Sequence, residues 1–202
     1  MTPERRLDKV LSLSVSAVTR TRLIPPEPPL SDGEIVLRLR REGDVAAIAR
    51  ASYDPETQRR LSDEPLDAER QQNSVERVEE QWSTGTSAPF VIADAGDDRP
   101  LGLLNLQFDS DDEVASLAVS VFPEVRGRGV AAKALRLGAV WGLRELGLAR
   151  VFAEAAVDNQ ASVRAIEKAG FHREGTLRAH CKTHGERHDC AMFSLIATDI
   201  QP

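Results

Sequence analysis

Hydrophobic and polar residues follow one another along the first half of the chain in patterns typical of strands joined by short helices. Residues 35–40, Ile-Val-Leu-Arg-Leu-Arg, alternate well enough to predict a first strand. The sequence Glu-Gly-Asp at 42–44 can cap a helix whose apolar positions are Val45, Ile48 and Ala49. Residues 52–86 are polar and charged, and 67–82 have helical spacing.

The second half continues with strands and two longer helices. Apolar runs at 90–93 and 101–106 flank the turn sequence Gly-Asp-Asp-Arg-Pro, which predicts a hairpin, and 113–121 adds another strand. A helix from about residue 130 to Gly147, a strand at 150–157, a helix containing Ser162 and a closing hairpin complete the chain. This order predicts an α/β (α+β) fold, with a central mixed, mostly antiparallel sheet and helices on both faces.

The first 32 residues are expected to be an N-terminal extension to a domain at 33–202. Pro-Pro-Glu-Pro-Pro at 25–29 favours polyproline II, so it predicts a linker or an arm lying across the domain. Residues 1–20 fit a short amphipathic helix and fit a strand nearly as well. Serines interrupt the apolar run after the basic residues 5, 6 and 9, so we interpret this end as non-targeting.

Composition narrows the class of protein. With 202 residues, 41% of them hydrophobic, the chain can bury a real core in one domain. A net charge of −6 argues against nucleic-acid binding and mildly favours a cationic or amine partner. The chain has no apolar run of the length that a membrane span needs, and two cysteines make no disulfide framework, so a cytoplasmic protein is expected.

The stretch from Val119 to Leu135 joins a predicted strand to a predicted helix through Arg-Gly-Arg-Gly at 126–129. The first amides of a helix lack acceptors within the helix and carry the positive end of its dipole. Glycines at 127 and 129 would let a phosphate approach the backbone, and the two arginines add positive charge. The turn therefore predicts a phosphate-binding site.

Two ligand classes fit this turn. Gly127-x-Gly129-x-x-Ala132 loosely matches the dinucleotide fingerprint, but a lone match of that kind is weak. Arg126-x-x-Gly129-x-Ala131 instead resembles the pyrophosphate loop of the GCN5-related N-acetyltransferases, the GNAT family, which binds acetyl-coenzyme A (acetyl-CoA).

Motifs further along the chain carry the same resemblance. Asn159, Ser162 and Gly170-Phe171 fall at the spacings of the GNAT family after its fifth strand. Glu-Gly-Thr-Leu-Arg at 174–178 and Gly-Glu-Arg-x-Asp at 185–189 are similar to the RimJ/RimL-like branch, which acetylates ribosomal-protein N-termini. The resemblance covers about residues 33–200 and implies a GNAT-fold N-acetyltransferase that transfers an acyl group directly from acetyl-CoA to a primary amine.

The resemblance also implies cofactor-binding and catalytic residues. Strand amides near Val121 are expected to hold the pantetheine arm and the thioester carbonyl. The expected cofactor-binding residues are Val119, Val121, Arg126, Gly127, Arg128, Gly129, Val130, Ala131, Ala132, Asn159 and Ser162. Many GNAT enzymes protonate the leaving thiolate with a tyrosine where this chain has Ile166, so Ser162 is the expected donor, with Asn159 beside it. Either residue could simply cap its helix.

The general base does not follow from the resemblance. The RimJ/RimL-like branch carries glutamates on its fourth and sixth strands, at positions that correspond to Ser116 and Cys181 here. Glu113 and His180 are nearby substitutes, and we include Glu113 among the expected catalytic residues. A charged residue at a strand start is often merely solvated, and a water chain acting on a weakly basic amine would need neither group.

Two cysteines flank the turn of the closing hairpin. If Gly185 and Glu186 are its central residues, Cys181 and Cys190 face each other, and if His184 and Gly185 are central, they do not. We expect no nucleophilic cysteine and no metal, because the nearby histidines make no compact ligand set.

The acceptor is expected to be cationic. The segment 53–80 carries nine acidic residues against four arginines and would border the acceptor site in this family, although a solvated helix face is an equal alternative. The acceptor would then be a protein N-terminus or an amine-bearing small molecule such as an aminoglycoside-like compound. The missing carboxylates also allow a non-catalytic CoA-binding sensor, and both a monomer and a homodimer remain open.

Overall fold

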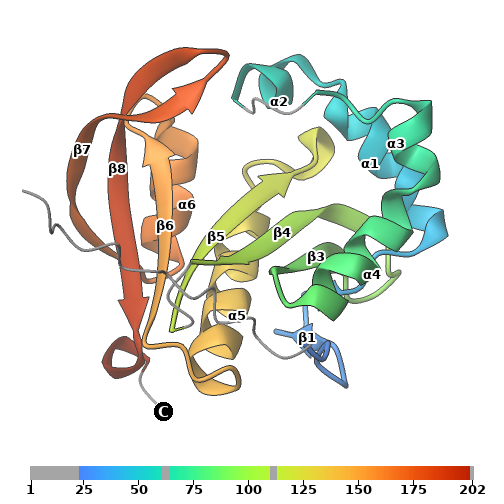
Figure 1. The fold of residues 1–202 in the computed structure, drawn as a ribbon, viewed down its shortest axis with the longest axis horizontal. Coiled ribbons are helices and arrows are strands. Elements are labelled where there is room, and N and C mark those ends of the chain that lie inside the picture. The colour runs from blue at the N-terminus through green and yellow to red at the C-terminus, as the bar shows by residue number, and fades with distance from the viewer. Residues whose placement is uncertain (1–22, 61–63, 110–112, 201–202) are drawn as a thin grey trace, which may run out of the picture.

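A computed structural model describes residues 23–60, 64–109 and 113–200, so the helix or strand expected over 1–20 lies outside the described residues. The centre of the molecule is a single sheet of eight strands in the order β1-β2-β3-β4-β5-β6-β8-β7 (Figure 1). The strands are β1 (Leu30–Ser31), β2 (Ile35–Arg38), β3 (Ser87–Asp94), β4 (Pro100–Phe108), β5 (Val114–Val121), β6 (Arg150–Ala156), β7 (His172–Thr183) and β8 (Glu186–Ile196). Among these described strands every neighbouring pair is antiparallel apart from β5 and β6, which are parallel.

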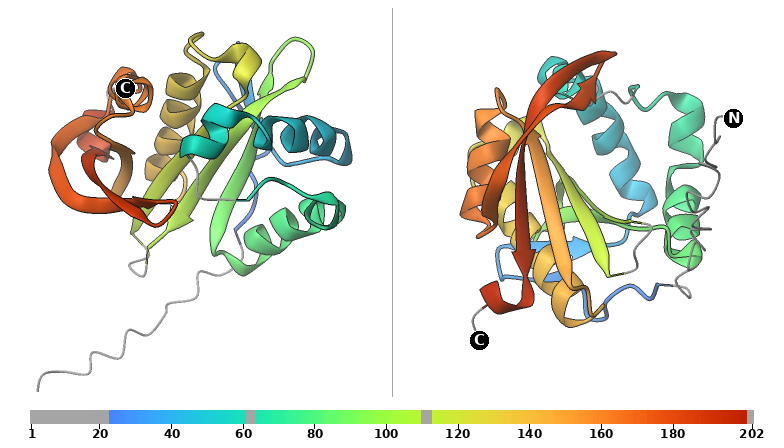
Figure 2. Two further views of the ribbon diagram at one scale, coloured as in Figure 1. Left: turned by 90° about the horizontal axis from the view of Figure 1, so that it is seen from above. Right: turned by 60° about the vertical axis from the view of Figure 1, so that its left-hand side comes forward.

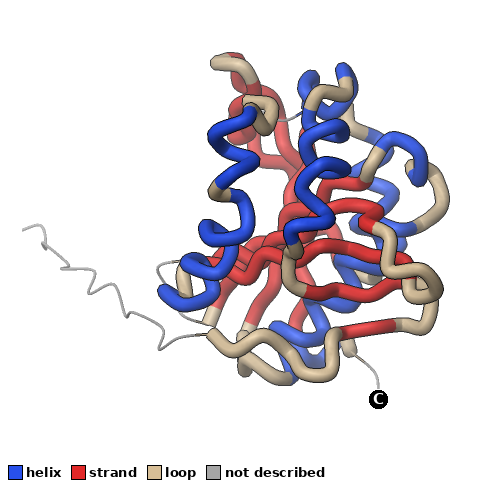
Figure 3. Tube along the Cα trace, turned by 90° about the vertical axis from the view of Figure 1, so that its right-hand side faces the viewer, coloured by secondary structure: helices blue, strands red, loops and turns tan. Residues whose placement is uncertain are grey.

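Helices cover both faces of this sheet. They are α1 (Val45–Ser52), α2 (Pro55–Arg60), α3 (Ala68–Gln72), α4 (Ser74–Thr84), α5 (Val130–Arg144) and α6 (Gln160–Lys168), with short 3₁₀ turns at Glu42–Asp44, Pro123–Val125 and Ala197–Asp199. The gold α5 and the green α4 lie on opposite sides of the strands (Figure 2). Figure 3 views the molecule from the side on which α1, α3 and α4 stand in front of the strands. The fold class predicted from the sequence is confirmed.

Helix α5 lies close against the sheet because two of its residues have no side chain. A Cβ at Gly138 would be 2.7 Å from Leu104 Cδ2, and one at Gly142 would be 2.9 Å from Leu148 Cδ1. The helix therefore contacts β2, β4, β5 and β6 together. It ends at Arg144, three residues before Gly147, which has a left-handed φ of 68° and lies in the following turn.

An aromatic cluster joins α4 to α5 at one end of the sheet. The ring centroid of Phe90 lies 5.1 Å from that of Trp82 and 5.5 Å from that of Trp141, in edge-to-face geometry. The backbone N–H of Leu23 donates to Trp82 O at 3.1 Å, and Leu23 is buried. The chain preceding β1 is thus attached to the domain core at Leu23, and β1 itself uses two residues of the stretch expected as an extension.

A buried ion pair fixes the C-terminal end of β2, at Arg38. Arg38 and Asp44 are 5% and 3% exposed, and two hydrogen bonds of 2.7 and 2.9 Å join the guanidinium to the carboxylate. The remaining guanidinium donors bind Asp98 Oδ1, Asp98 O and Leu39 O, so the group has a partner for every N–H. Burial alone would raise the pKa of Asp44, but hydrogen bonds from Arg38 and from the Arg41 N–H outweigh that effect and lower the pKa.

Within the described residues, no helix combines the length and the apolar character that a membrane crossing requires.

We predict that Asp44→Asn lowers the free energy of unfolding by about 3 kcal/mol at pH 7, because it removes the buried one of the two carboxylates that Arg38 binds and leaves only the half-exposed Asp98. The folded-state pKa of Asp44 is depressed, so its contribution is complete above about pH 4 and is lost as pH falls through the folded-state value. Urea unfolding should therefore show a gap between wild type and variant that closes in acid.

The matched control is Asp97→Asn, in the same turn as Asp98, where the carboxylate is exposed and lies 3.5 Å from Arg99. An exposed pair of this kind contributes at most about 1 kcal/mol. Equal losses in the two variants would show that the buried pair has no special role.

Candidate active site

A long cleft opens between β5 and β6, where the sheet divides. The two strands pair in parallel only from Val114–Arg150 to Ser116–Phe152. Beyond these residues β5 stays paired with β4 and β6 stays paired with β8, so the two strands separate. The cleft has a volume of about 1390 Å³, above the roughly 300–1,000 Å³ usual for a small-molecule site. It has room for a long ligand and a second, smaller one.

The predicted phosphate turn forms one end of this cleft. Gly127 and Gly129 have left-handed φ values of 76° and 83°, and Gly129 is the N-cap of α5. The N–H groups of Val130, Ala131 and Ala132 precede the first intrahelical bond, which Lys133 N makes to Gly129 O at 3.1 Å. These residues line the cleft, so the positive end of the α5 dipole faces it.

The two arginines of the turn differ in position. Arg126 lines the cleft, whereas Arg128 is exposed and is not among the described residues that line it. Two basic residues that sequence reasoning missed, Arg164 and Lys168 on α6, do line it. Lys168 Nζ lies 3.6 Å from where a Cβ of Gly129 would be, which adds a positive charge at the phosphate turn.

The side walls of the cleft come from the separated strands β5 and β6. Val119 and Val121 of β5 both line it, as expected. In β5 the buried Leu117 lies on the α5 face, so Ser116 and Ala118 point to the opposite face. By the same alternation in β6, Val151 and Ala153 are buried, while Phe152 and Glu154 share the face of Ser116.

Asn159 and Ser162 meet at the start of α6. Asn159 is the N-cap residue, and its Oδ1 accepts the Ser162 N–H at 3.2 Å. Both residues line the cleft, and Ser162 remains half-buried. The capping role considered for Asn159 is present, and the position of Ser162 is compatible with a ligand contact.

Helix α2 lies across the mouth of the cleft and is attached to three other elements. Arg126 donates to Asp54 Oδ2 at 2.6 Å and to Thr57 Oγ1 at 2.8 Å. Arg60 pairs with Asp158, before α6, at 3.1 Å, and His184 Nε2 lies 2.7 Å from Gln58 O. The Thr57 N–H and then Arg126 lower the pKa of Asp54, so this carboxylate is charged at neutral pH.

Glu113 is not brought to the cleft. It lies in the turn before β5, and its carbonyl oxygen accepts the N–H groups of Ala149 and Arg150 at 2.8 and 3.2 Å. This is the closed end of the β5–β6 pair, away from the point where the strands separate. The structure therefore separates Glu113 from Asn159 and Ser162.

Several of the described acidic residues in the segment 53–80 contact nearby arginines or helix N–H groups. Glu56 lines the cleft and pairs with Arg59 and Arg60. Glu64 pairs with Arg70 at 2.6 Å, and Asp67 caps α3 by accepting Arg70 N. Glu56 is the one acidic residue in the described part of this segment that lines the cleft, so the negative groove expected from these residues stays a prediction. Asp63 lies outside the described residues.

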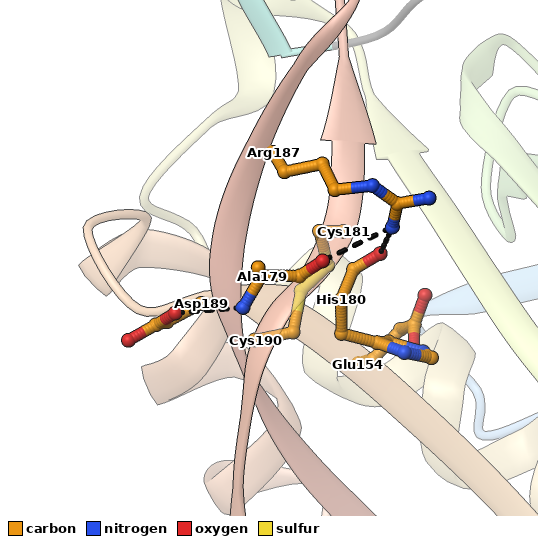
Figure 4. The surroundings of a disulfide bond; sticks show 7 residues. All are labelled: Glu154, Ala179, His180, Cys181, Arg187, Asp189 and Cys190. Atoms are coloured by element: carbon orange, nitrogen blue, oxygen red, sulfur yellow. Dashed lines mark hydrogen bonds and ion pairs between the residues drawn. A yellow bond between two sulfur atoms is a disulfide. The ribbon is translucent and has the colours of Figure 1, made fainter.

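A carboxylate and an imidazole meet on the wall beyond Phe152. Glu154 Oε2 lies 3.1 Å from His180 Nε2, and both residues line the cleft (Figure 4). Glu154 was not identified from the sequence. The alternation within β6 could have found it, since Val151, Ala153 and Ala155 are apolar and Glu154 lies between them on the other face.

A bulge in β7 places His180 there. Leu177 pairs with Cys190, but Cys181 pairs with His188, so residues 178–180 stand opposite Asp189 alone. Within the bulge Ala179 has a left-handed φ of 50°, its N–H donates to Asp189 Oδ1 at 2.8 Å, and Arg187 donates to its carbonyl.

The same bulge brings the two cysteines together. Thr183 pairs with Glu186, so His184 and Gly185 are the central turn residues, the register for which we expected the cysteines not to face each other. Cys181 stands opposite His188 rather than Cys190, as expected for this register, but the bulge at 178–180 still leaves the two cysteines close enough to bond. Cys181 and Cys190 form a disulfide with a Cα–Cα distance of 5.7 Å.

Within the described parts of the chain, no group of three or more histidine, cysteine, aspartate or glutamate side chains could hold a metal ion.

Comparisons with known proteins agree on one family. A family model described as "Acetyltransferase (GNAT) domain" matches residues 34–172. The chain is 28% identical over 140 residues to "Probable N-acetyltransferase YjcK" of Bacillus subtilis, which covers 68% of this chain and 77% of that protein.

Two solved structures share the fold. Mycobacterium smegmatis RimJ in complex with CoA-disulfide has a TM-score of 0.74 and 21% identity, covering 86% of this chain and 88% of that one. Spermidine N-acetyltransferase from Vibrio cholerae in complex with CoA and spermine has a TM-score of 0.70 and 20% identity, covering 83% and 98%.

Proposed function

The chain belongs to the GNAT acetyltransferase family, and from that premise we propose that it transfers the acetyl group of acetyl-CoA to a cationic primary amine in a ternary complex. The observation that carries the proposal is the separation of β5 from β6 directly beside the glycine turn that begins α5. A ligand there meets backbone donors, a helix N-terminus and basic side chains in one continuous cleft.

The residues present fit CoA. The left-handed glycines 127 and 129 leave no Cβ between a pyrophosphate and the first amides of α5, and Arg126 and Lys168 supply positive charge. The β5 backbone at Val119 and Val121 holds the pantetheine arm, with Asn159 and Ser162 on the opposite wall. Bound acetyl-CoA supplies a thioester carbonyl for the amine nitrogen to attack.

Residues of this chain then move the protons. Ser162 begins α6 on the cleft wall, and we assign it the proton that the departing sulfur needs. Ile166, at the place where many family members have tyrosine, is buried and has no proton to give. Ser162 is therefore the donor in this proposal.

A cationic acceptor is supported by carboxylates other than those expected. Asp109, directly after β4, lines the cleft together with Glu154 of β6 and Glu186 of β8. The solved neighbour bound to spermine, a polyamine, is an example of this acceptor class within the fold. We extend the class, cationic primary amines, to this chain.

An acceptor panel tests the function. Release of free CoA thiol from acetyl-CoA should accelerate with spermidine, with a serine- or alanine-starting peptide or with an aminoglycoside, and should be weaker with neutral amines. Rising salt should weaken the apparent acceptor affinity, since the Debye length falls from about 10 Å at 0.1 M to about 3 Å at 1 M. Tight CoA binding with no acceleration by any amine would instead support a sensor.

We predict that Gly129→Val abolishes CoA binding measured by calorimetry, because a branched side chain at φ 83° blocks the approach of a phosphate to the α5 amides. Gly33→Val is the matched control, since Gly33 has a φ of 89° in the turn before β2, away from the cleft. Undiminished CoA affinity in Gly129→Val would disprove the location of the site.

We predict that Ser162→Ala lowers kcat by about 10²-fold and leaves CoA affinity nearly unchanged, if the hydroxyl gives its proton to the thiolate. Steady-state kinetics with the best acceptor of the panel and calorimetry with CoA separate these quantities. A kcat within a few-fold of wild type would assign the donor to another group or to water.

A further inference from the structure

The cleft needs a group that takes a proton from the acceptor. A primary ammonium cannot attack a thioester until it loses a proton, because its nitrogen has no lone pair. The positions that carry glutamate in the RimJ/RimL-like branch hold Ser116 and the disulfide-bonded Cys181 in this chain, and neither is a base. Glu113 lies outside the cleft.

We propose that Glu154 and His180 together form the general base, with His180 as the catalytic residue and Glu154 as the residue that positions it. This inference rests on the proposed function. The two residues come from β6 and β7, which are separated in the sheet by β8.

Strand register puts Glu154 on the acceptor side of the cleft. Ser116 pairs with Phe152, so Glu154 lies two residues beyond this pair on the same face, where β5 and β6 have separated. The carboxylate is thus one strand away from the position where the resemblance places a base. Leu117 and Ala153, which alternate with these residues, are buried on the α5 face.

The contact between the two side chains defines their roles. With Nε2 of His180 donating to Glu154 Oε2 at 3.1 Å, the neutral ring carries its lone pair on Nδ1. The side chains are 48% and 39% exposed, so an acceptor entering the cleft can reach them. A carboxylate that accepts from one ring nitrogen fixes the orientation of the ring, as in the triads of hydrolases.

Residues of β8 hold the backbone around His180 in place. Arg187 donates to the carbonyls of Ala179 and His180 at 3.0 and 3.3 Å, and Asp189 accepts the Ala179 N–H. The neighbouring Cys181 is tied to Cys190, which is fully buried (Figure 4). A histidine on this bulge is therefore attached to β8 on both sides of its backbone.

The proton inventory is complete with these groups. Nδ1 of His180 takes one proton from the ammonium, and the freed nitrogen lone pair forms the new bond to the carbonyl carbon. The C–S bond breaks, and Ser162 gives a proton to the sulfur and regains one that leaves the amide nitrogen. The imidazolium returns its proton to water, so no oxidant or further reactant is needed.

The test compares wild type with His180→Ala and Glu154→Gln, using an alanine-starting peptide as acceptor. At pH 6.5 its α-amine is mostly protonated, and His180→Ala should lower kcat by about 10²-fold. At pH 9 the amine is mostly neutral, and the loss should shrink to a few-fold. Added imidazole should restore part of the rate at pH 6.5, which a merely structural role of the ring would not allow.

Glu154→Gln keeps a hydrogen-bond acceptor for Nε2 but removes the charge. We expect a loss of about tenfold at pH 6.5 that also shrinks at pH 9, whereas Glu154→Leu should lose as much as His180→Ala. The pH readout also reflects the other titratable groups that line the same cleft, which stay unchanged in every variant. These are Glu56, Asp109, Asp158, Lys168, His184, Glu186 and His188, beside the permanently charged Arg59, Arg60, Arg126 and Arg164.

His172→Ala is the matched control. His172 lies on the same strand, 3.7 Å from the carboxylate of Asp199, but it is not among the described residues lining the cleft. CoA affinity measured by calorimetry should stay at the wild-type value in all these variants. If His180→Ala loses affinity for CoA, His180→Gln is measured in its place.

The proposal is overturned if the His180 variants retain a kcat within three-fold of wild type at pH 6.5, or if their loss is equal at both pH values. If wild type binds CoA but acetylates no amine, the proposed function fails, and the base assignment fails with it. An active wild type with unaffected His180 variants rejects the base alone.

Discussion

The separation of two parallel strands is the constraint on which the rest of this molecule depends. Up to the Ser116–Phe152 pair, β5 and β6 form an ordinary ladder, and beyond it each keeps only its outer neighbour. The backbone edges that face each other across the gap lack ladder partners, a condition that proteins tolerate only where water or a ligand replaces them. The sheet remains a single body because α5 contacts strands on both sides of the division.

Local patterns in the sequence predicted most of the helices and strands, because the alternation of apolar residues and the turn-forming residues determine them within a few positions. The alternation of 35–40, the turn at 96–100 and the glycines before α5 all produced the expected structures. The geometry of the glycine turn was predictable for the same reason, since a helix N-terminus with left-handed glycines is encoded within a few residues. The resemblance to the GNAT family singled out Asn159 and Ser162, and the structure places both at the start of α6.

Features that depend on register between distant strands could not be predicted in this way. The cysteine pairing depended on a bulge around Ala179, which no turn rule around His184 and Gly185 reveals. A count of charges in the acidic segment could not show which carboxylates have partners, such as Arg70 for Glu64. The alternation within β6 marks Glu154 as a residue that faces away from the core, but its contact with His180 appears only when β6 and the β7 bulge are placed together.

The ion pair between Arg126 and Asp54 would lower the net free energy that a phosphate gains by binding Arg126. In the described structure the guanidinium already has a carboxylate at 2.6 Å and a hydroxyl at 2.8 Å. A phosphate that recruits Arg126 must either share this arginine or displace Asp54. The measured free energy of cofactor binding then contains the gain of the Arg126–phosphate pair minus the loss of the Arg126–Asp54 pair. It is therefore smaller than the attraction between Arg126 and the phosphate alone. Because salt weakens both pairs, the cofactor's affinity depends less on ionic strength than its charge suggests.

The displaced carboxylate belongs to the segment that leads into α2, so occupancy at one end of the cleft is mechanically linked to the element that crosses its mouth.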